Sequence, residues 1–169
     1  MTTKWADVAA RLGRNDYPVA LANAVGTQQL TDTAEIAAGL EAAWTMAEWP
    51  ARTLSTDLWL TLFGTVLDNG EYLNHTTPAT TAELPELITL YRGATDETSR
   101  GMSWTDNLEQ AQWFATRLTN IGYPGARVYE IGALNTMVLA RFHSRGEDEW
   151  VLDPTMFEPD DVVPRHPIR

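Results

Sequence analysis

The hydrophobic pattern of this chain changes its period near residues 75–82, and this change constrains the fold most. Before it, apolar residues recur every three or four positions, as in amphipathic helices; after it, they alternate or form short runs, as in strands. The segment at the change, His75 to Ala82 (HTTPATTA), is polar and rich in threonine, which is typical of a connection. The sequence therefore predicts an α+β fold, with a helical N-terminal region at 1–80 and a sheet-based core at 81–169.

The length and composition fit a folded globular protein. The chain of 169 residues is long enough for one domain, or for one domain with a helical extension, and we expect one compact unit. Its hydrophobic content is 44% and it contains seven tryptophans, so it has the material for a real core.

Three helices are expected in the N-terminal region. Each is marked by an apolar stripe at helical spacing and by a residue that caps or breaks a helix. They are Trp5–Leu12, a helix from Thr31 or Thr33 that ends at Pro50, and one that follows a Ser55 cap and stops at Asp68-Asn69-Gly70.

The second region is expected to consist of several strands and one helix. The expected strands are residues 87–91, the polar segment 103–105, and residues 126–131, 136–142 and 149–152. A capping-box-like start at residues 106–109, with Thr105 or Asp106 as the cap, predicts the helix. Its apolar residues, including Trp113-Phe114, are assigned to packing, and the proline-rich tail is expected along the surface.

The charge and the missing residue types exclude several classes of function. A net charge of −11 argues against nucleic-acid binding through a basic surface and favours small molecules or basic protein surfaces as partners. The absence of cysteine removes disulfides and thiolate sites, and His75, His143 and His166 lack metal-ligand spacing, so we expect no metal. No apolar run is long enough for a membrane helix and no signal peptide is visible, so the expected location is the cytoplasm.

Three consecutive acids stand at the entrance of an apolar strand. They are Glu147, Asp148 and Glu149, followed by Trp150-Val151-Leu152. In an extended segment Glu147 and Glu149 point to the same face, where like charges raise each other's pKa. Such a cluster is either a charged hairpin tip in solvent or a site that stabilises a cation.

Two further segments combine apolar strands with polar side chains. Arg92 follows the apolar run 87–91, where it can bind a phosphate or carboxylate in a bidentate manner, and Gly93 lets a ligand approach the backbone. Ser103 and Thr105 share one face of an extended segment, with Trp104 between them. Taken alone, each segment also fits a plain structural role: a surface arginine, or a polar strand that leads into a helix cap.

In their order along the chain, these segments resemble the R-S-E class of mono-ADP-ribosyltransferases. The resemblance covers residues 87–153: Tyr91-Arg92-Gly93, then Ser103-x-Thr105, then a helix with Ala111 and Phe114-Ala115, then Glu147-x-Glu149. The family consists of NAD-dependent enzymes, many of them bacterial toxins and some carried by phages. The resemblance implies a split mixed or antiparallel sheet as the core.

The resemblance also implies a role for each site residue. Glu149 would be the catalytic glutamate that holds the 2′-hydroxyl of the nicotinamide ribose, and Glu147 would be the acid that goes with arginine as the acceptor. Arg92 would contact the NAD phosphates or ribose. Ser103 would brace the nicotinamide end, and Thr105 would support the same strand. Trp104, Tyr91 or Tyr123 would stack on a ring of NAD.

The chain departs from the family pattern at two places. The middle motif is Ser-Trp-Thr, and the segment between Phe142 and Glu147, where the family recognises its acceptor, is short. The resemblance as a whole predicts an NAD-dependent ADP-ribosyltransferase that modifies an exposed arginine of a protein. The alternatives are an NAD glycohydrolase, a binding protein of the same fold without turnover, and a structural protein in which the acids form a solvated turn.

Overall fold

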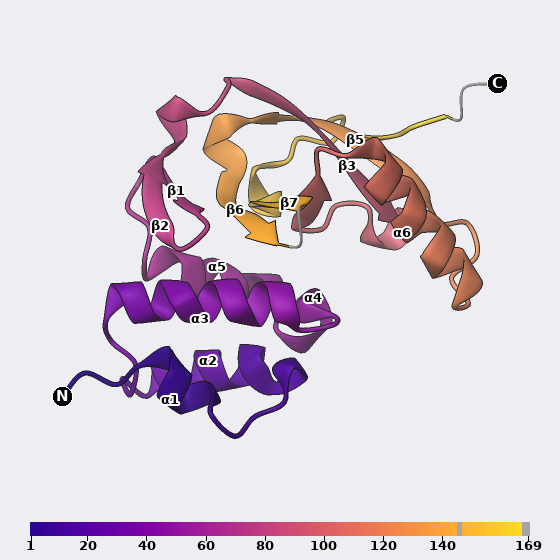
Figure 1. The fold of residues 1–169 in the computed structure, drawn as a ribbon. Helices are drawn as coiled ribbons and strands as arrows, with labels where there is room; N and C mark the ends of the chain where they lie inside the picture. The colour runs from indigo at the N-terminus through magenta and orange to yellow at the C-terminus, as the bar shows by residue number, and fades with distance from the viewer. Residues whose placement is uncertain (145–146, 167–169) are drawn as a thin grey trace. The chain divides into compact units, whose positions relative to one another are not determined.

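The first part of the chain is mainly helical, and the second part is organised around strands (Figure 1). The structure is a computed structural model, described for residues 1–144 and 147–166, with the side chains of Ser144 and Glu147 left out. The chain divides into two compact units, Met1–Thr80 and Thr81–Arg169. The predicted α+β class is confirmed. Within the described residues, no helix is both long and apolar enough to cross a membrane.

The first unit contains five α-helices and a hairpin among its described residues. The helices are α1 (Trp5–Ala9), α2 (Tyr17–Gly26), α3 (Thr33–Met46), α4 (Pro50–Thr53) and α5 (Thr56–Gly64), with a 3-10 turn at Arg14–Asp16. The hairpin pairs β1 (Glu71–Asn74) with β2 (Thr77–Thr80) in antiparallel register.

Polar caps explain where two of these helices begin. The side chain of Asp32 accepts a hydrogen bond from the Glu35 amide at the start of α3, and that of Ser55 accepts one from Leu58 at the start of α5. The predicted Ser55 cap is confirmed. The helix α3 ends at Met46, so the predicted end at Pro50 is wrong by a few residues. Pro50 instead begins α4, because proline suits the first turn of a helix.

Four elements of the first unit were not predicted, namely α2, α4, β1 and β2. Helix α2 carries apolar side chains on most of its faces, so its period is weak. The segment expected to be a plain connection contains β2, which pairs residue by residue with β1. That part of the prediction is wrong because threonine is a good strand former, and its polarity says little about pairing.

The core of the first unit is aromatic. Trp44 and Trp59 meet edge to face at 4.8 Å, and Phe63 lies 6.4 Å from Trp44. All three side chains are buried, and the indole of Trp59 donates a hydrogen bond to the carbonyl of Pro50. These contacts tie α3, α4 and α5 together.

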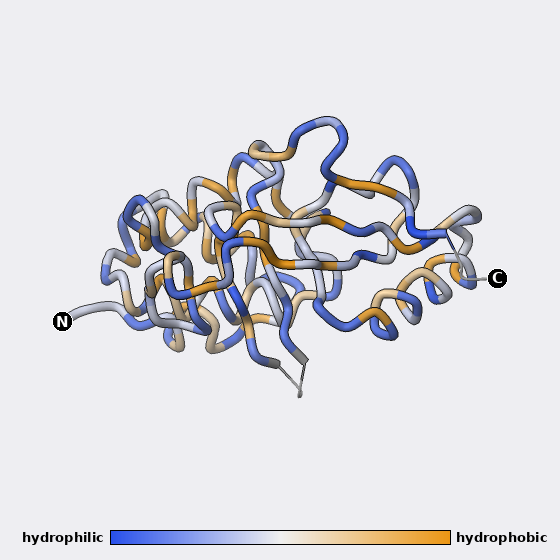
Figure 2. The backbone as a smooth tube through the Cα atoms, turned by 90° about the horizontal axis from the view of Figure 1, so that it is seen from above, coloured by the Kyte–Doolittle hydropathy of each residue, from blue (hydrophilic) through white to orange (hydrophobic). Residues whose placement is uncertain are grey.

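The second unit is built on antiparallel strands. In spatial order they are β6 (Val138–Ser144), β7 (Glu147–Leu152), β4 (Ser103–Thr105), β3 (Leu87–Ala94), β5 (Arg127–Leu134) and β8 (Val162–Pro164). Short 3-10 turns lie at Thr81–Glu83, Asp96–Thr98, Asn135–Met137 and Pro154–Met156. Figure 2 shows orange, apolar stretches along the extended segments and blue at many of the turns. All expected strands are present; β8 in the tail was not predicted.

Helix α6 (Leu108–Asn120) packs against β3 and β5, as Figure 1 shows. Its cap is Asn107, whose side chain accepts a hydrogen bond from the Gln110 amide. The prediction of Thr105 or Asp106 as the cap is therefore wrong by one or two residues. Thr105 instead accepts a hydrogen bond from the Asn107 amide and so shapes the turn into the helix.

The packing face of α6 is narrower than its sequence suggests. Ala111 and Ala115 are buried against the sheet, whereas Trp113 is 53% exposed and Phe114 is 38% exposed. The assignment of Trp113-Phe114 to the core is therefore wrong. A close approach of helix and strand needs small residues, so the alanines face inward and the aromatic pair is left outside.

Strand β6 carries an irregularity that changes its pairing with β7. Val138 pairs with Leu152, but Ala140 pairs with Val151, so Leu139 is an extra residue in β6. Such a bulge moves every later side chain of the strand to the opposite face. Beyond it, Arg141 lies opposite Trp150, Phe142 opposite Glu149 and His143 opposite Asp148.

Candidate functional site

Arg92, Ser103 and Glu149 come from three neighbouring strands and meet at one place. Strand β4 lies between β3 and β7, and Thr105 is the residue that pairs with both Tyr91 and Glu149. Adjacent antiparallel strands bring residues at such positions within side-chain reach of each other. The three residues that the sequence singled out at a distance along the chain are therefore neighbours.

Ser103 is joined to Glu149 by a short hydrogen bond. Its hydroxyl donates to Oε1 of Glu149 at 2.6 Å, between two partly buried side chains. A hydroxyl that binds a carboxylate makes a charge-assisted hydrogen bond, which fixes the rotamer of the acid. The bond therefore holds the glutamate in one orientation.

Arg92 is held by the backbone. Its Nε donates to the carbonyl of Thr98 at 3.0 Å and its Nη1 to the carbonyl of Ser103 at 2.8 Å. Burial lowers the pKa of Arg92 from its ordinary value to about 10, while the nearby charge of Glu149 acts in the opposite direction. Arg92 thus stays cationic at neutral pH, in a site where a positive charge is costly unless an anion accompanies it.

Gly101 makes room for the Arg92 guanidinium. A Cβ atom at this position would lie 2.5 Å from Nη2 and 2.6 Å from Cζ of Arg92. Any side chain at 101 would therefore displace the arginine. Sequence reasoning missed this residue, and the only signal it offers is a glycine two positions before Ser103.

Gly93 serves packing in this structure. A Cβ atom there would lie 2.6 Å from the Ala115 amide nitrogen and 2.9 Å from Cβ of Phe114. The space beside Gly93, which the sequence suggested for a ligand, is thus filled by the backbone of α6. Glycine at this position allows β3 and α6 to approach each other closely.

Trp104 belongs to the core rather than to a ligand surface. Its ring is 2% exposed and packs edge to face on Phe157, and its indole donates to the carbonyl of Gly101 at 2.9 Å. No ring face is left open for stacking on NAD. Its register partner is Trp150, also buried, so the two tryptophans fill the side of the sheet away from Ser103 and Glu149.

The three acids of residues 147–149 differ in surroundings. Asp148 accepts hydrogen bonds from Arg141, at 3.0 and 2.5 Å, and contacts Nδ1 of His143 at 2.5 Å. Partial burial raises the pKa of Asp148, but the hydrogen bonds of Arg141 and His143 outweigh it and lower the pKa below its ordinary range. The predicted role of the Glu147 side chain lies outside the described residues; its backbone begins β7.

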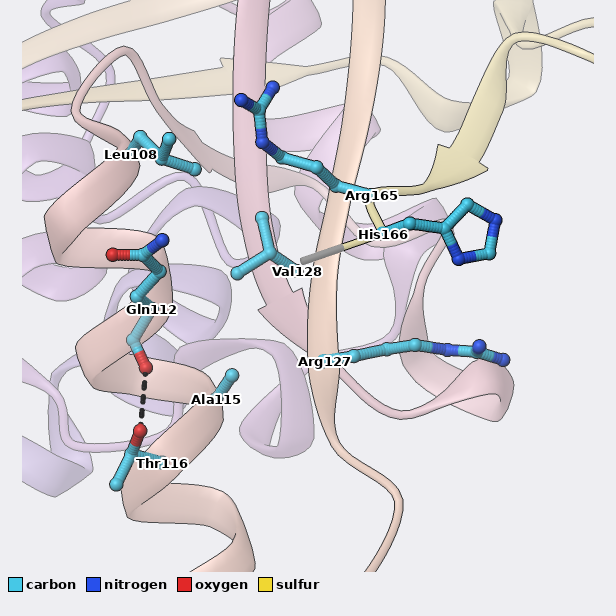
Figure 3. A pocket seen from close by; sticks show the side chains of 8 residues that line it. All are labelled: Leu108, Gln112, Ala115, Thr116, Arg127, Val128, Arg165 and His166. Carbon is cyan, nitrogen blue, oxygen red and sulfur yellow. Dashed lines mark hydrogen bonds between the residues drawn. The ribbon is translucent and has the colours of Figure 1, made fainter. Parts of the chain in front are cut away.

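Two surface cavities border α6, and neither is lined by Arg92, Ser103 or Glu149. The larger measures about 450 Å³, between α6 and β5 (Figure 3). Figure 3 shows Gln112 and Ala115 facing it, whereas the side chains of Arg127 and His166 point away from the helix. Arg127 is bound to Asp96, so the cavity has few groups available for an anion.

The residues that could hold a metal are few. Within the described parts of the chain, no group of three or more histidine, aspartate or glutamate side chains is arranged for a metal ion.

Comparisons with protein-family models, with curated proteins and with solved structures found no significant match. Function must therefore be argued from the geometry of Arg92, Ser103 and Glu149.

Proposed function

We propose that the chain is an NAD-dependent mono-ADP-ribosyltransferase of the R-S-E class that modifies an arginine side chain of a protein. One observation carries the proposal: Arg92, Ser103 and Glu149, in the family's order along the chain, form a continuous set of contacts. The structure thus brings together a partly buried arginine, a serine and a carboxylate from three strands.

The chemistry of NAD cleavage fits this arrangement. Breaking the bond between nicotinamide and ribose builds positive charge on the sugar, as in glycoside hydrolysis, and a fixed carboxylate stabilises that charge. Glu149 is such a carboxylate, and Ser103 fixes its rotamer. In the proposed complex, Glu149 holds the 2′-hydroxyl of the ribose.

The proposed role of Arg92 is to bind the pyrophosphate of NAD. Its guanidinium is oriented by two backbone carbonyls, and its Nη2 lies against Gly101. An arginine oriented in this way presents its remaining N–H groups to phosphate oxygens without a metal. NAD binding would also relieve the cost of partly burying the charge of Arg92.

The proposed acceptor is an exposed arginine on a basic protein surface. Glu147 would orient and polarise the incoming guanidinium, as the family resemblance implies, and the net charge of −11 would attract a cationic partner. Release of ADP-ribose to water is the corresponding glycohydrolase reaction, with the same requirement for Glu149.

The test is nicotinamide release and label transfer from NAD by wild type and Glu149→Gln. We expect Glu149→Gln to lower turnover by about 10²–10³-fold, in line with the loss of a single charge-stabilising group. The matched control is Glu130→Gln, a carboxylate of β5 that pairs with Arg165 and is expected to keep full turnover.

Two results would contradict the proposal in different ways. Turnover that Glu149→Gln leaves unchanged removes Glu149 from catalysis. NAD binding that requires Arg92, with no turnover by wild type, instead favours a binding protein without catalysis.

A further inference from the structure

The 3-10 turn that follows β3 supplies one of the two carbonyls that hold Arg92. The turn consists of Asp96–Thr98, and Nε of Arg92 donates to the carbonyl of Thr98 at 3.0 Å. Arg92 lies near the end of β3, so the chain leaves the strand and turns back toward its own arginine. The position of this turn therefore affects the orientation of the guanidinium.

Polar side chains within the turn give it a defined shape. Oγ1 of Thr98 accepts a hydrogen bond from the Thr95 amide at 3.2 Å, and the two threonine hydroxyls lie 3.0 Å apart. The hydroxyl of Ser99 donates to the carbonyl of Asp96 at 2.9 Å. Such local hydrogen bonds shape a turn. They join residues 95–99 only to one another, so they do not decide where the turn lies on the sheet.

The carboxylate of Asp96 attaches the turn to β5. Its Oδ1 accepts hydrogen bonds from the hydroxyl of Tyr129 and from Nη2 of Arg127, the latter at 2.7 Å. These hydrogen bonds lower the pKa of Asp96 below its ordinary range, whereas burial and the bond to Asp96 raise the pKa of Tyr129. At neutral pH Asp96 is therefore an anion and Tyr129 a neutral donor, as the contacts require.

The register of β3 and β5 sets this attachment beside Arg92. Tyr129 is the pairing partner of Arg92, and Arg127 is that of Ala94. Residues that pair in antiparallel strands project to the same face of a sheet. Although the side chain of Asp96 is exposed, Tyr129 is buried, so its hydroxyl is a fixed point. The attachment is therefore more than an exposed ion pair, which on its own would contribute little.

We propose that Asp96 is a positioning residue for NAD binding, because it holds the turn on β5 and thereby keeps the Thr98 carbonyl in place to orient Arg92. This inference rests on the proposed function, in which Arg92 binds the pyrophosphate. Asp96 does not touch NAD and acts only through the backbone of the turn. Its loss should therefore weaken NAD binding and leave the chemical step largely intact.

The experiment compares Asp96→Ala and Asp96→Asn with wild type, with Asp153→Ala as the matched control. Asp153 also accepts hydrogen bonds at the start of a 3-10 turn, from the amide and hydroxyl of Thr155 at 2.9 and 2.6 Å, but its turn follows β7. We measure the Kd for NAD by calorimetry, kcat for nicotinamide release at saturating NAD, and the rate at which the Nε proton of Arg92 exchanges with water, by NMR.

The expected results separate positioning from a general loss of structure. For Asp96→Ala the Kd for NAD should rise about threefold to tenfold, the range expected for one lost hydrogen bond, with kcat changed less than about twofold. The Nε proton of Arg92 should exchange faster, because its acceptor is no longer held in place. Asp96→Asn keeps an acceptor oxygen for Tyr129 and should recover most of the affinity. Asp153→Ala should match wild type in all three measurements.

Three outcomes would overturn the inference. They are an unchanged exchange rate of the Arg92 proton in Asp96→Ala, a fall in kcat with no change in the Kd for NAD, or an equal effect of Asp153→Ala. Should Asp96→Ala not fold, Tyr129→Phe decides, because it removes one donor to Asp96 and must also speed the exchange. Should wild type not bind NAD, the proposed function fails, and the exchange rates still support or overturn the positioning of Arg92 by Asp96.

Discussion

Single residues of this chain take their roles from the backbone around them. Arg92 is oriented by two carbonyls, and Gly93 and Gly101 matter because they lack a side chain. None of these relations can be read from a residue type alone. They depend on which backbone atoms the sheet and α6 bring close.

Gly93 gives a direct test of the contact between β3 and α6. A methyl group there would meet the backbone of α6 rather than a movable side chain, so we expect Gly93→Ala to lower the free energy of unfolding by about 1–3 kcal/mol. Gly64, in α5, has open space around it, and Gly64→Ala should be neutral or stabilising. Chemical denaturation of the two variants checks this, and equal effects would contradict the packing role.

The lowered pKa of Asp148 makes the stability of the fold depend on pH. Its pKa is lowered in the folded state, so its contribution is present above the unfolded pKa and is lost as the pH falls through the folded pKa. We expect the Asp148→Asn variant to lose less stability than wild type between about pH 4 and pH 2. Denaturation across this range measures it; Asp160→Asn, at an exposed carboxylate, is the control, and parallel curves for Asp148→Asn and wild type would contradict it.

The elements show which parts of the fold were predictable. The helix that follows Ser55 and the strands at 126–131 and 136–142 were predicted because a cap or a clear alternation marks each one. Helix α2 was not, because its faces are nearly all apolar. The outward position of Trp113 could not be predicted, because periodicity shows a stripe but not how closely a strand approaches it.

The candidate site also has parts that the sequence predicted and parts that it did not. Arg92, Ser103 and Glu149 were found from their order and residue types, and the structure brings them together. The hydrogen bonds from Arg141 to Asp148 were not predicted from the sequence, because they depend on the register of β6. A bulge of one residue leaves almost no trace in a sequence, yet it moves every later side chain of the strand to the opposite face of the sheet.

The start of α6 provides a test at the scale of an element. Asn107 supplies the side-chain acceptor for the first turn, so Asn107→Ala should lower the free energy of unfolding by about 1 kcal/mol. Asn120, at the other end of the same helix, is the matched control, and Asn120→Ala should change stability by less than about half of that. Equal losses at both ends would show that Asn107 is not the effective cap.

At the scale of the whole molecule, the net charge of −11 acts on any cationic partner. If the acceptor is an arginine on a basic surface, raising the salt concentration from about 50 to 500 mM should weaken modification of an arginine-rich peptide by about fivefold or more. Nicotinamide release to water serves as the control, since water carries no charge. A peptide reaction that salt leaves unchanged would contradict electrostatic attraction of the acceptor.

The two glycines near Arg92 affect how a random-mutagenesis screen for inactive variants would be interpreted. A carbon atom added at Gly93 would meet the backbone of α6, and one added at Gly101 would displace the guanidinium of Arg92, although neither glycine carries a group that can react. In a screen for the proposed activity, substitutions at either glycine should therefore be lost in the same way as substitutions at Glu149. The yield of folded protein separates the two kinds of variant. Variants changed at Gly93 should give little folded protein, whereas Glu149→Gln should give folded protein that lacks the proposed activity.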